Sequence, residues 1–188
     1  MLNNDQIYIV VDIETDGPVP GLYSMLSIGA VATTANEELS SFYRKVLRVE
    51  GATQHFPTMK WWKTQPEAWE EVTSEAQPAE VVIKDFCSWL DSIGKIPVFV
   101  AHPVGFDYAF VSWYLWKFAN KNPFTTTTGA SKTLDLPSFI SGRLKLDLNM
   151  SERKKLSSPL TTGMPDHSHK AIDDARGFGV ILRNVLNS

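Results

Sequence analysis

The hydrophobic pattern near the start of the chain predicts a buried strand. Residues 7–11 form a continuous apolar run rich in β-branched side chains, Ile-Tyr-Ile-Val-Val, which is typical of a central strand covered on both faces. Two further runs, Met25 to Thr33 and Leu39 to Leu47, are separated by the turn-forming residues Ala35-Asn36-Glu37. Together the three runs predict an antiparallel meander.

The remaining pattern alternates between helix and strand. Val81 to Ile93 has helical periodicity, Pro97 to Ala101 reads as a buried strand, and a second helix is expected to follow and end at about Asn120. A last helix is predicted over roughly Lys170 to Val185. Strands followed by helix, strand and helix indicate an α/β fold, with a mixed central sheet flanked by helices. Residues 122–132 and 151–168 are expected to be irregular.

Four carboxylates occupy special places in this pattern. Asp12 and Glu14, two residues apart, directly follow the first apolar run and therefore point to the same face of its strand. Asp107 falls in the first turn of its predicted helix, where the helix dipole favours an anion. Asp174 borders the packed stripe of the last helix and is expected to face inward.

Like charges brought this close would raise each other's pKa values and destabilise the fold unless a cation offsets them. Carboxylate oxygens are hard ligands and favour Mg²⁺ or Mn²⁺. The pattern therefore predicts a phosphodiesterase site with two divalent ions, bound by Asp12, Glu14, Asp107 and Asp174.

Three short motifs carry a family resemblance: Asp12-Ile13-Glu14-Thr15, Phe106-Asp107, and His169-x-Ala171-x-x-Asp174 with the following Ala175. They resemble the motifs of the DEDDh 3′–5′ exonucleases, a group that includes the proofreading subunit of bacterial DNA polymerase III, ribonuclease T and oligoribonuclease. All five signature residues occur in order, and the resemblance extends from Ile7 to Val185. It implies a ribonuclease H-like fold, with residues 1–188 forming a single exonuclease domain.

The resemblance also implies a reaction. The chain is expected to hydrolyse terminal phosphodiesters from the free 3′ end of single-stranded DNA or RNA and to release nucleoside monophosphates. One ion would activate the attacking water and the other would stabilise the leaving 3′ oxygen. Asp12, Glu14, Asp107, His169 and Asp174 are the expected catalytic residues, with His169 as general base. Spacing does not tell which carboxylate bridges the ions, although in the family the first-motif aspartate does so, which would be Asp12.

The chain departs from the usual family pattern at two positions. Asp16 stands where the first motif commonly has threonine, and Pro103 stands where asparagine often precedes the second motif. Asp16 is expected to add negative charge beside the site. His102 and His167 do not match the signature, and we expect both to be structural or exposed.

Aromatic residues suggest a substrate platform. Trp61 and Trp62 lie in a dense aromatic patch that begins at Phe56, and exposed rings of this kind can stack on terminal bases. The alternative is that they belong to a helix core, and because adjacent helical residues point to different faces, one of the two is expected to be buried. Thr15 and Phe106 are further expected substrate contacts.

The net charge of −3 is unusual for a nucleic-acid-binding protein, since phosphate contacts normally need a basic surface. Two divalent ions would add four positive charges where the substrate binds. The clusters 143–145 and 153–155 could add a modest basic rim, or could simply be solvated loops. A non-catalytic nucleic-acid-binding or interaction module is the alternative function, against which the intact set of five signature residues argues.

The single cysteine, Cys87, excludes an intramolecular disulfide and is expected in the core. The first residues lack the pattern of a signal peptide, and no apolar run approaches membrane-spanning length. We therefore expect a cytoplasmic protein with no membrane partner, and leave open whether it forms a homodimer.

Overall fold

The computed structural model describes residues 5–165 and 168–188. Its centre is a single mixed sheet of five strands. Its strands are β1 (Gln6–Thr15), β2 (Met25–Thr33), β3 (Glu38–Lys45), β4 (Ile96–Ala101) and β5 (Thr133–Asp135), in the spatial order β3-β2-β1-β4-β5. β1, β2 and β3 form the antiparallel meander, whereas β4 and β5 run parallel to β1. The predicted meander is confirmed, and β1 continues past its apolar run to include both Asp12 and Glu14.

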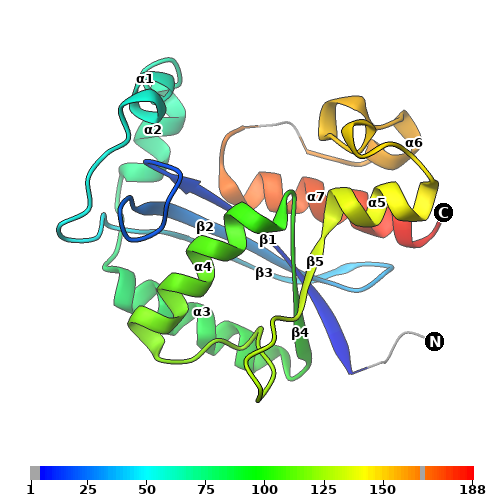
Figure 1. Cartoon of the computed structure of the whole chain (residues 1–188), viewed down its shortest axis with the longest axis horizontal. Helices are drawn as coiled ribbons and strands as arrows, with labels where there is room; N and C mark the ends of the chain where they lie inside the picture. The colour runs from blue at the N-terminus through cyan, green and yellow to red at the C-terminus, as the bar shows by residue number, and fades with distance from the viewer. Residues whose placement is uncertain (1–4, 166–167) are drawn as a thin grey trace.

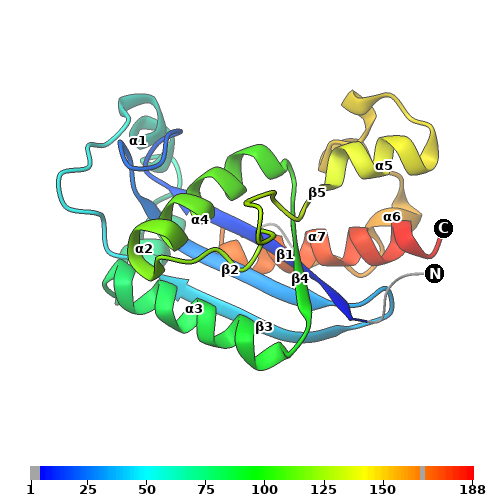
Figure 2. The ribbon, with the colours of Figure 1, turned by 60° about the horizontal axis from the view of Figure 1, so that its bottom comes forward.

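Helices cover both faces of the sheet, with α3 and α4 on one side and α7 on the other (Figures 1 and 2). The helical elements are α1 (Phe56–Trp62), α2 (Pro66–Thr73), α3 (Ala79–Ile93), α4 (Val104–Ala119), α5 (Leu136–Leu144), the 3₁₀ turns η1 (Leu148–Met150) and η2 (Arg153–Lys155), α6 (Ser158–Thr161) and α7 (Ala171–Leu186). The predicted flanked sheet is therefore confirmed. Cys87 lies buried in α3, as expected.

The fold contains several short elements that the sequence analysis did not predict, among them α1, α2 and η1. β5 and α5 were not predicted, although Asp135 provides a start signal because its side chain accepts a hydrogen bond from the Ser138 backbone N–H at the beginning of α5. The segment 151–168, expected to be irregular, contains η2 and α6. Helices of three or four residues are too short to produce a readable hydrophobic period.

The alternation along β1 separates two hydrophobic cores. Ile9, Val11 and Ile13 belong to the core that contains residues of α3 and α4, whereas Val10 belongs to the core that contains residues of α7. Since side chains of a strand alternate between its faces, Asp12 and Glu14 lie on the face that carries Val10. Both carboxylates are thereby directed to the side of the sheet that α7 covers.

A glycine in β2 allows α7 to approach the sheet closely. Gly29 is the register partner of Asp12, and a Cβ atom at Gly29 would lie 2.3 Å from the backbone carbonyl carbon of Ala171 and 2.3 Å from the nitrogen of Ile172. Only a residue without a side chain permits this contact. The start of α7 therefore rests directly on β2 beside Asp12.

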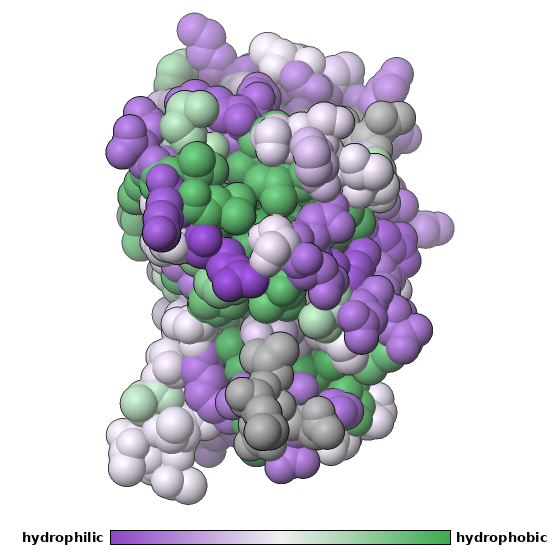
Figure 3. Space-filling view, turned by 90° about the vertical axis from the view of Figure 1, so that its right-hand side faces the viewer, coloured by the Kyte–Doolittle hydropathy of each residue, from purple (hydrophilic) through white to green (hydrophobic). Residues whose placement is uncertain are grey.

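The surface near α5, α6 and the C-terminus is mixed in character. Figure 3 shows this side of the molecule, where hydrophobic side chains lie exposed among hydrophilic ones in the upper half of the view. Leu146, Leu148 and Met150, in the segment after α5, are among the exposed large hydrophobic residues. No helix within the described residues is long and apolar enough to cross a membrane.

Candidate active site

Three carboxylates converge where β1 meets the start of α7. Asp12, Glu14 and Asp174 each offer an oxygen atom, and these atoms all lie within 4.8 Å of one another. Asp12 and Glu14 come from the α7-facing side of β1, and Asp174 comes from the first turn of α7, where it is 3% exposed. Sequence-distant acids are thus brought into one all-oxygen cluster of the kind that binds hard divalent cations.

Asp107, the fourth predicted ligand, approaches from the first turn of α4. Its side chain is buried, and its Oδ1 accepts a hydrogen bond from the Ile13 backbone N–H at 3.1 Å. It is not one of the three residues that make up the tight oxygen cluster. Its negative charge nevertheless raises the pKa values of both Asp12 and Glu14, which places it on the border of the site.

Burial shifts the pKa values of Asp12, Glu14 and Asp107 upward, and repulsion by neighbouring carboxylates adds to the shift at Asp12 and Glu14. Burial is the largest cause for Asp12, whose pKa is raised well above its ordinary value, with further increases from Asp107, Glu14 and Asp174. Burial, followed by the charges of Asp174 and Asp107, raises the pKa of Glu14 to about 8, and burial raises the pKa of Asp107 to about 7. A divalent cation would favour the ionised form of all three acids, so the donor set fits such an ion.

The predicted base, His169, lies just before α7 and has a left-handed backbone φ of 55°. Its ring packs edge-on against Trp61, with 5.1 Å between ring centroids and 82° between ring planes. Trp61, in α1, is 39% exposed. An accessible aromatic ring therefore adjoins the histidine. The neighbouring His167 lies outside the described residues.

The two adjacent tryptophans have different environments. Trp62 is 1% exposed and packs with Leu26 and Val72, and its indole Nε1–H donates to the Thr15 carbonyl oxygen at 2.9 Å. Trp62 is therefore the buried member of the pair, and its ring packs in the core beside the end of β1, whereas substrate contact by Trp61 stays a prediction. Of the other expected substrate contacts, Thr15 is buried, whereas Phe106 is partly exposed and packs on Phe110.

Asp16, which was expected to add negative charge beside the site, is paired with Arg48. Its carboxylate is fully buried and accepts hydrogen bonds from the Ser24 backbone N–H at 2.6 Å and from Arg48 Nε at 2.7 Å. Its role is to hold the loop between β1 and β2. His102 is also structural, as expected: its ring stacks on Phe178, and its Nε2–H donates to the Ser151 carbonyl oxygen.

Arg153 is a site residue that sequence reasoning missed. Its Nη1 lies 2.5 Å from Asp174 Oδ1. Arg153 therefore belongs to the site itself and not to a basic rim or a solvated loop, the two expectations for residues 153–155. No signal in the sequence links the two residues, because they are separated by 21 positions that include α6 and the loop before α7. Arg143, in the other predicted basic cluster, donates instead to the carbonyl oxygen of Ser188.

Comparison with known protein families matches residues 7–186 to the 3′–5′ exoribonuclease Rv2179c-like domain. The chain belongs to this family. The match spans all five signature residues and every strand from β2 to β5. Membership makes the chain a 3′–5′ exonuclease, in agreement with the activity expected from its motifs.

Curated relatives of this Rv2179c-like chain are nucleic-acid enzymes. The 3′–5′ DNA exonuclease Cap18 of Escherichia coli is 29% identical over 98% of this chain and 94% of its own length. The PolC-type DNA polymerase III of Thermotoga maritima is 24% identical over 92% of this chain but only 11% of its own length. The chain thus matches nearly all of the first relative and a small part of the second.

Solved structures confirm the fold. The nuclease domain of 3′hExo, a DEDDh family member bound to rAMP, has a TM-score of 0.73 at 11% identity and covers 98% of this chain and 94% of its own. The zinc-bound complex of E. coli ExoI with single-stranded DNA has a TM-score of 0.69 at 13% identity, covering 98% of this chain and 41% of ExoI. The Rv2179c-like chain therefore has the ribonuclease H-like fold of the DEDDh nucleases, and its acidic cluster is consistent with dependence on divalent metal.

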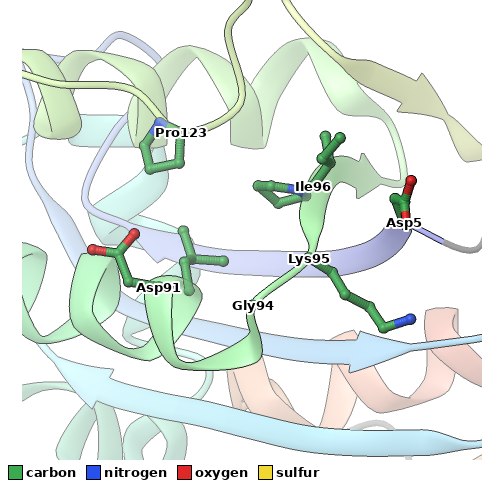
Figure 4. A pocket seen from close by; sticks show the side chains of 8 residues that line it. Asp5, Asp91, Gly94, Lys95, Ile96 and Pro123 are labelled. Carbon is green, nitrogen blue, oxygen red and sulfur yellow. The ribbon is translucent and has the colours of Figure 1, made fainter.

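A separate hollow of about 620 Å³ lies away from this chemistry. It is lined by residues before β1 and at the start of β4, including Asp5 and Ile96, which is the opposite end of β1 from Asp12 and Glu14. Asp5 and Asp91 lie on opposite sides of it (Figure 4). Its acids do not converge, so the hollow offers no alternative to the carboxylate cluster.

Proposed function

We propose that this chain removes nucleotides one at a time from the free 3′ end of single-stranded nucleic acid, using two Mg²⁺ or Mn²⁺ ions. The convergence of Asp12, Glu14 and Asp174 oxygens within 4.8 Å carries the proposal. Asp107 completes the proposed ligand set from the border of the cluster. These carboxylates would hold the ions, which when bound would supply polarisation of the phosphodiester and of the attacking water and stabilisation of charge on the leaving 3′ oxygen.

Asp12 is the proposed bridging ligand between the two ions. In the DEDDh enzymes the first-motif aspartate has this role, and Asp12 occupies that motif. Its oxygen lies within 4.8 Å of oxygens of both Glu14 and Asp174, so it could share an ion with either residue.

His169 is the proposed general base. It precedes Asp174 by five residues and is not part of the three-carboxylate cluster, and one of its ring nitrogens would accept a proton from the attacking water. Trp61 limits the positions open to the His169 ring by edge-on contact. The exposed part of Trp61, together with Phe106, would contact the terminal nucleotide, since both rings are accessible.

The substrate sugar, ribose or deoxyribose, differs among the proteins that this chain resembles. The family is described as exoribonuclease, the relative Cap18 is described as a DNA exonuclease, and the similar 3′hExo structure contains rAMP. We propose that the chain, as a single exonuclease domain, accepts single strands by their free 3′ end. Recognition of the 2′ hydroxyl would decide between RNA and DNA.

Matched RNA and DNA oligonucleotides of several lengths, labelled at the 5′ end, test this proposal directly. We expect stepwise shortening from the 3′ end in Mg²⁺ or Mn²⁺, with one sugar preferred. A 3′ phosphate should slow the reaction, and a circular single strand should resist it. Cleavage of the circle at a rate comparable with the linear strand would contradict an exonuclease, and tight binding without cleavage would support the alternative of a binding module.

A further inference from the structure

Arg153 places a positive charge inside the acidic cluster. The Arg153 and Asp174 side chains are only 19% and 4% exposed, and their charged atoms lie 2.5 Å apart. The guanidinium also lies close enough to Asp12 for its charge to lower the pKa of that carboxyl. Charged groups paired at this degree of burial interact more strongly than a surface pair.

The position of Arg153 is built into the fold. The guanidinium carbon lies 5.5 Å from the ring centroid of Phe178 in α7, and His102 stacks on the same ring with 4.8 Å between centroids and 5° between planes. The Nε2–H of His102 donates to the carbonyl oxygen of Ser151 at 2.8 Å. Residues from the end of β4 and from α7 therefore hold both the arginine and the chain that carries it.

The packing of α7 also leaves room for this side chain. A Cβ atom at Gly177 would lie 3.4 Å from Nη2 of Arg153 and 3.1 Å from the terminal carbon of Met164. A side chain at this position would therefore contact the guanidinium and press on Met164, so glycine leaves both of them undisturbed.

The backbone around Arg153 is weakly packed. Residues of η1 and η2 are exposed or partly exposed, and Ser151, between them, is buried. Among the residues that the structure describes, the Ser151 hydroxyl is one of two buried side-chain polar groups that lack a hydrogen-bond partner. Because most residues of η1 and η2 face solvent, a change of partner by the Arg153 side chain would disturb few buried contacts.

We propose that Arg153 is a further functional residue of this exonuclease, whose guanidinium can pair either with Asp174, as in this structure, or with the phosphate of the scissile linkage. The proposal rests on the metal-dependent function argued above. A divalent ion held by Asp174 would repel the guanidinium and would compete with it for the carboxylate. The phosphate of the substrate offers it a replacement, because the planar fork of arginine pairs with two phosphate oxygens.

Arg153→Gln separates this role from a structural one. Removal of the competing cation should tighten Mn²⁺ binding to the metal-free protein by about fivefold or more, measured by calorimetric titration. Loss of the phosphate contact should lower kcat on a single-stranded oligonucleotide at saturating Mn²⁺ by about tenfold to a hundredfold. The two effects have opposite signs, whereas a residue that only maintains the fold would weaken both properties.

Two further variants serve as controls. Arg153→Lys keeps the charge but not the fork, so Mn²⁺ affinity should stay close to that of the unmodified protein while kcat remains low. Lys154→Gln removes the neighbouring exposed charge and should change neither measurement. The proposal is overturned if Arg153→Gln leaves Mn²⁺ affinity unchanged or weaker, or leaves kcat unchanged. An unmodified protein without exonuclease activity would instead overturn the proposed function, while the Mn²⁺ titrations would still report on the pair of Arg153 and Asp174.

Discussion

At the scale of single residues, the account depends on His169 acting as a base beside the carboxylates. His169→Ala should lower kcat by about 10²–10⁴-fold, the usual contribution of general-base catalysis, while Mn²⁺ affinity stays close to that of the unmodified protein. Rates and calorimetric titrations of the same preparations measure both.

His167 provides the matched control, since it lies two positions away in the sequence but does not match the signature. His167→Ala should retain near-normal turnover. Equal damage from both substitutions would refute the assignment of the base, as would normal turnover of His169→Ala at neutral pH.

The place of a single residue in the site could be predicted only where the residue belongs to a recognisable sequence pattern. Strand alternation and helical spacing in the sequence point to Asp12, Glu14 and Asp174. The structure brings oxygen atoms of these three residues together. Trp62 could not be told from Trp61, because sequence shows that two neighbours face differently but not which of them faces the core. Arg153 carries no pattern at all, since its contact with Asp174 is made entirely by tertiary packing.

At the scale of elements, the contact between β2 and α7 aligns the site. Gly29→Ala would place a methyl group 2.3 Å from the backbone of α7, so the start of the helix must move. Overpacking of this kind costs about 1–3 kcal/mol, and here the shift also displaces Asp174 from Asp12. We therefore expect a lower melting temperature and weaker Mn²⁺ binding, followed by thermal denaturation and calorimetry.

Gly142→Ala is the control, because Gly142 lies within α5 and its added Cβ would have no atom within 4 Å. Alanine is the better helix former, so this variant should be as stable as the unmodified protein or slightly more so. Equal behaviour of the two variants would show that the close approach at Gly29 does not position α7.

Element prediction succeeded where hydrophobic runs were long and failed where elements were short. β2 and α3 follow from their apolar patterns, and the alternation in β1 correctly gave the shared face of Asp12 and Glu14. β5 has only three residues, and its place at the sheet edge depends on pairing with β4. Such an element is specified by tertiary contacts more than by its own sequence.

At the scale of the whole molecule, the acidic cluster should make metal-free stability depend on pH. The folded-state pKa values of Glu14 and Asp107, about 8 and about 7, exceed the ordinary values of 4.5 and 3.8, and that of Asp12 is also raised. The folded state therefore binds more protons than the unfolded state between these limits, so stability is lost as the pH rises through the folded-state pKa values.

In EDTA, the melting temperature should accordingly fall between about pH 5 and about pH 8, and Mn²⁺ should raise it more at the upper end of this range. Asp107→Asn should flatten the dependence in EDTA, since it removes one buried acid and its repulsion of Asp12 and Glu14. A melting temperature in EDTA that stays constant or rises over this interval would contradict the electrostatic description of the site.

The most direct test of the central claim is product analysis with a 5′-labelled single strand, comparing the unmodified protein with Asp174→Asn in Mn²⁺. Asp174→Asn keeps the shape of the side chain but removes the charge of a carboxylate in the oxygen cluster. The account predicts a ladder of products shortened from the 3′ end, release of nucleoside monophosphates, and loss of both in EDTA or in the variant. Products cut internally, activity that persists in EDTA, or an Asp174→Asn enzyme of normal rate would contradict it.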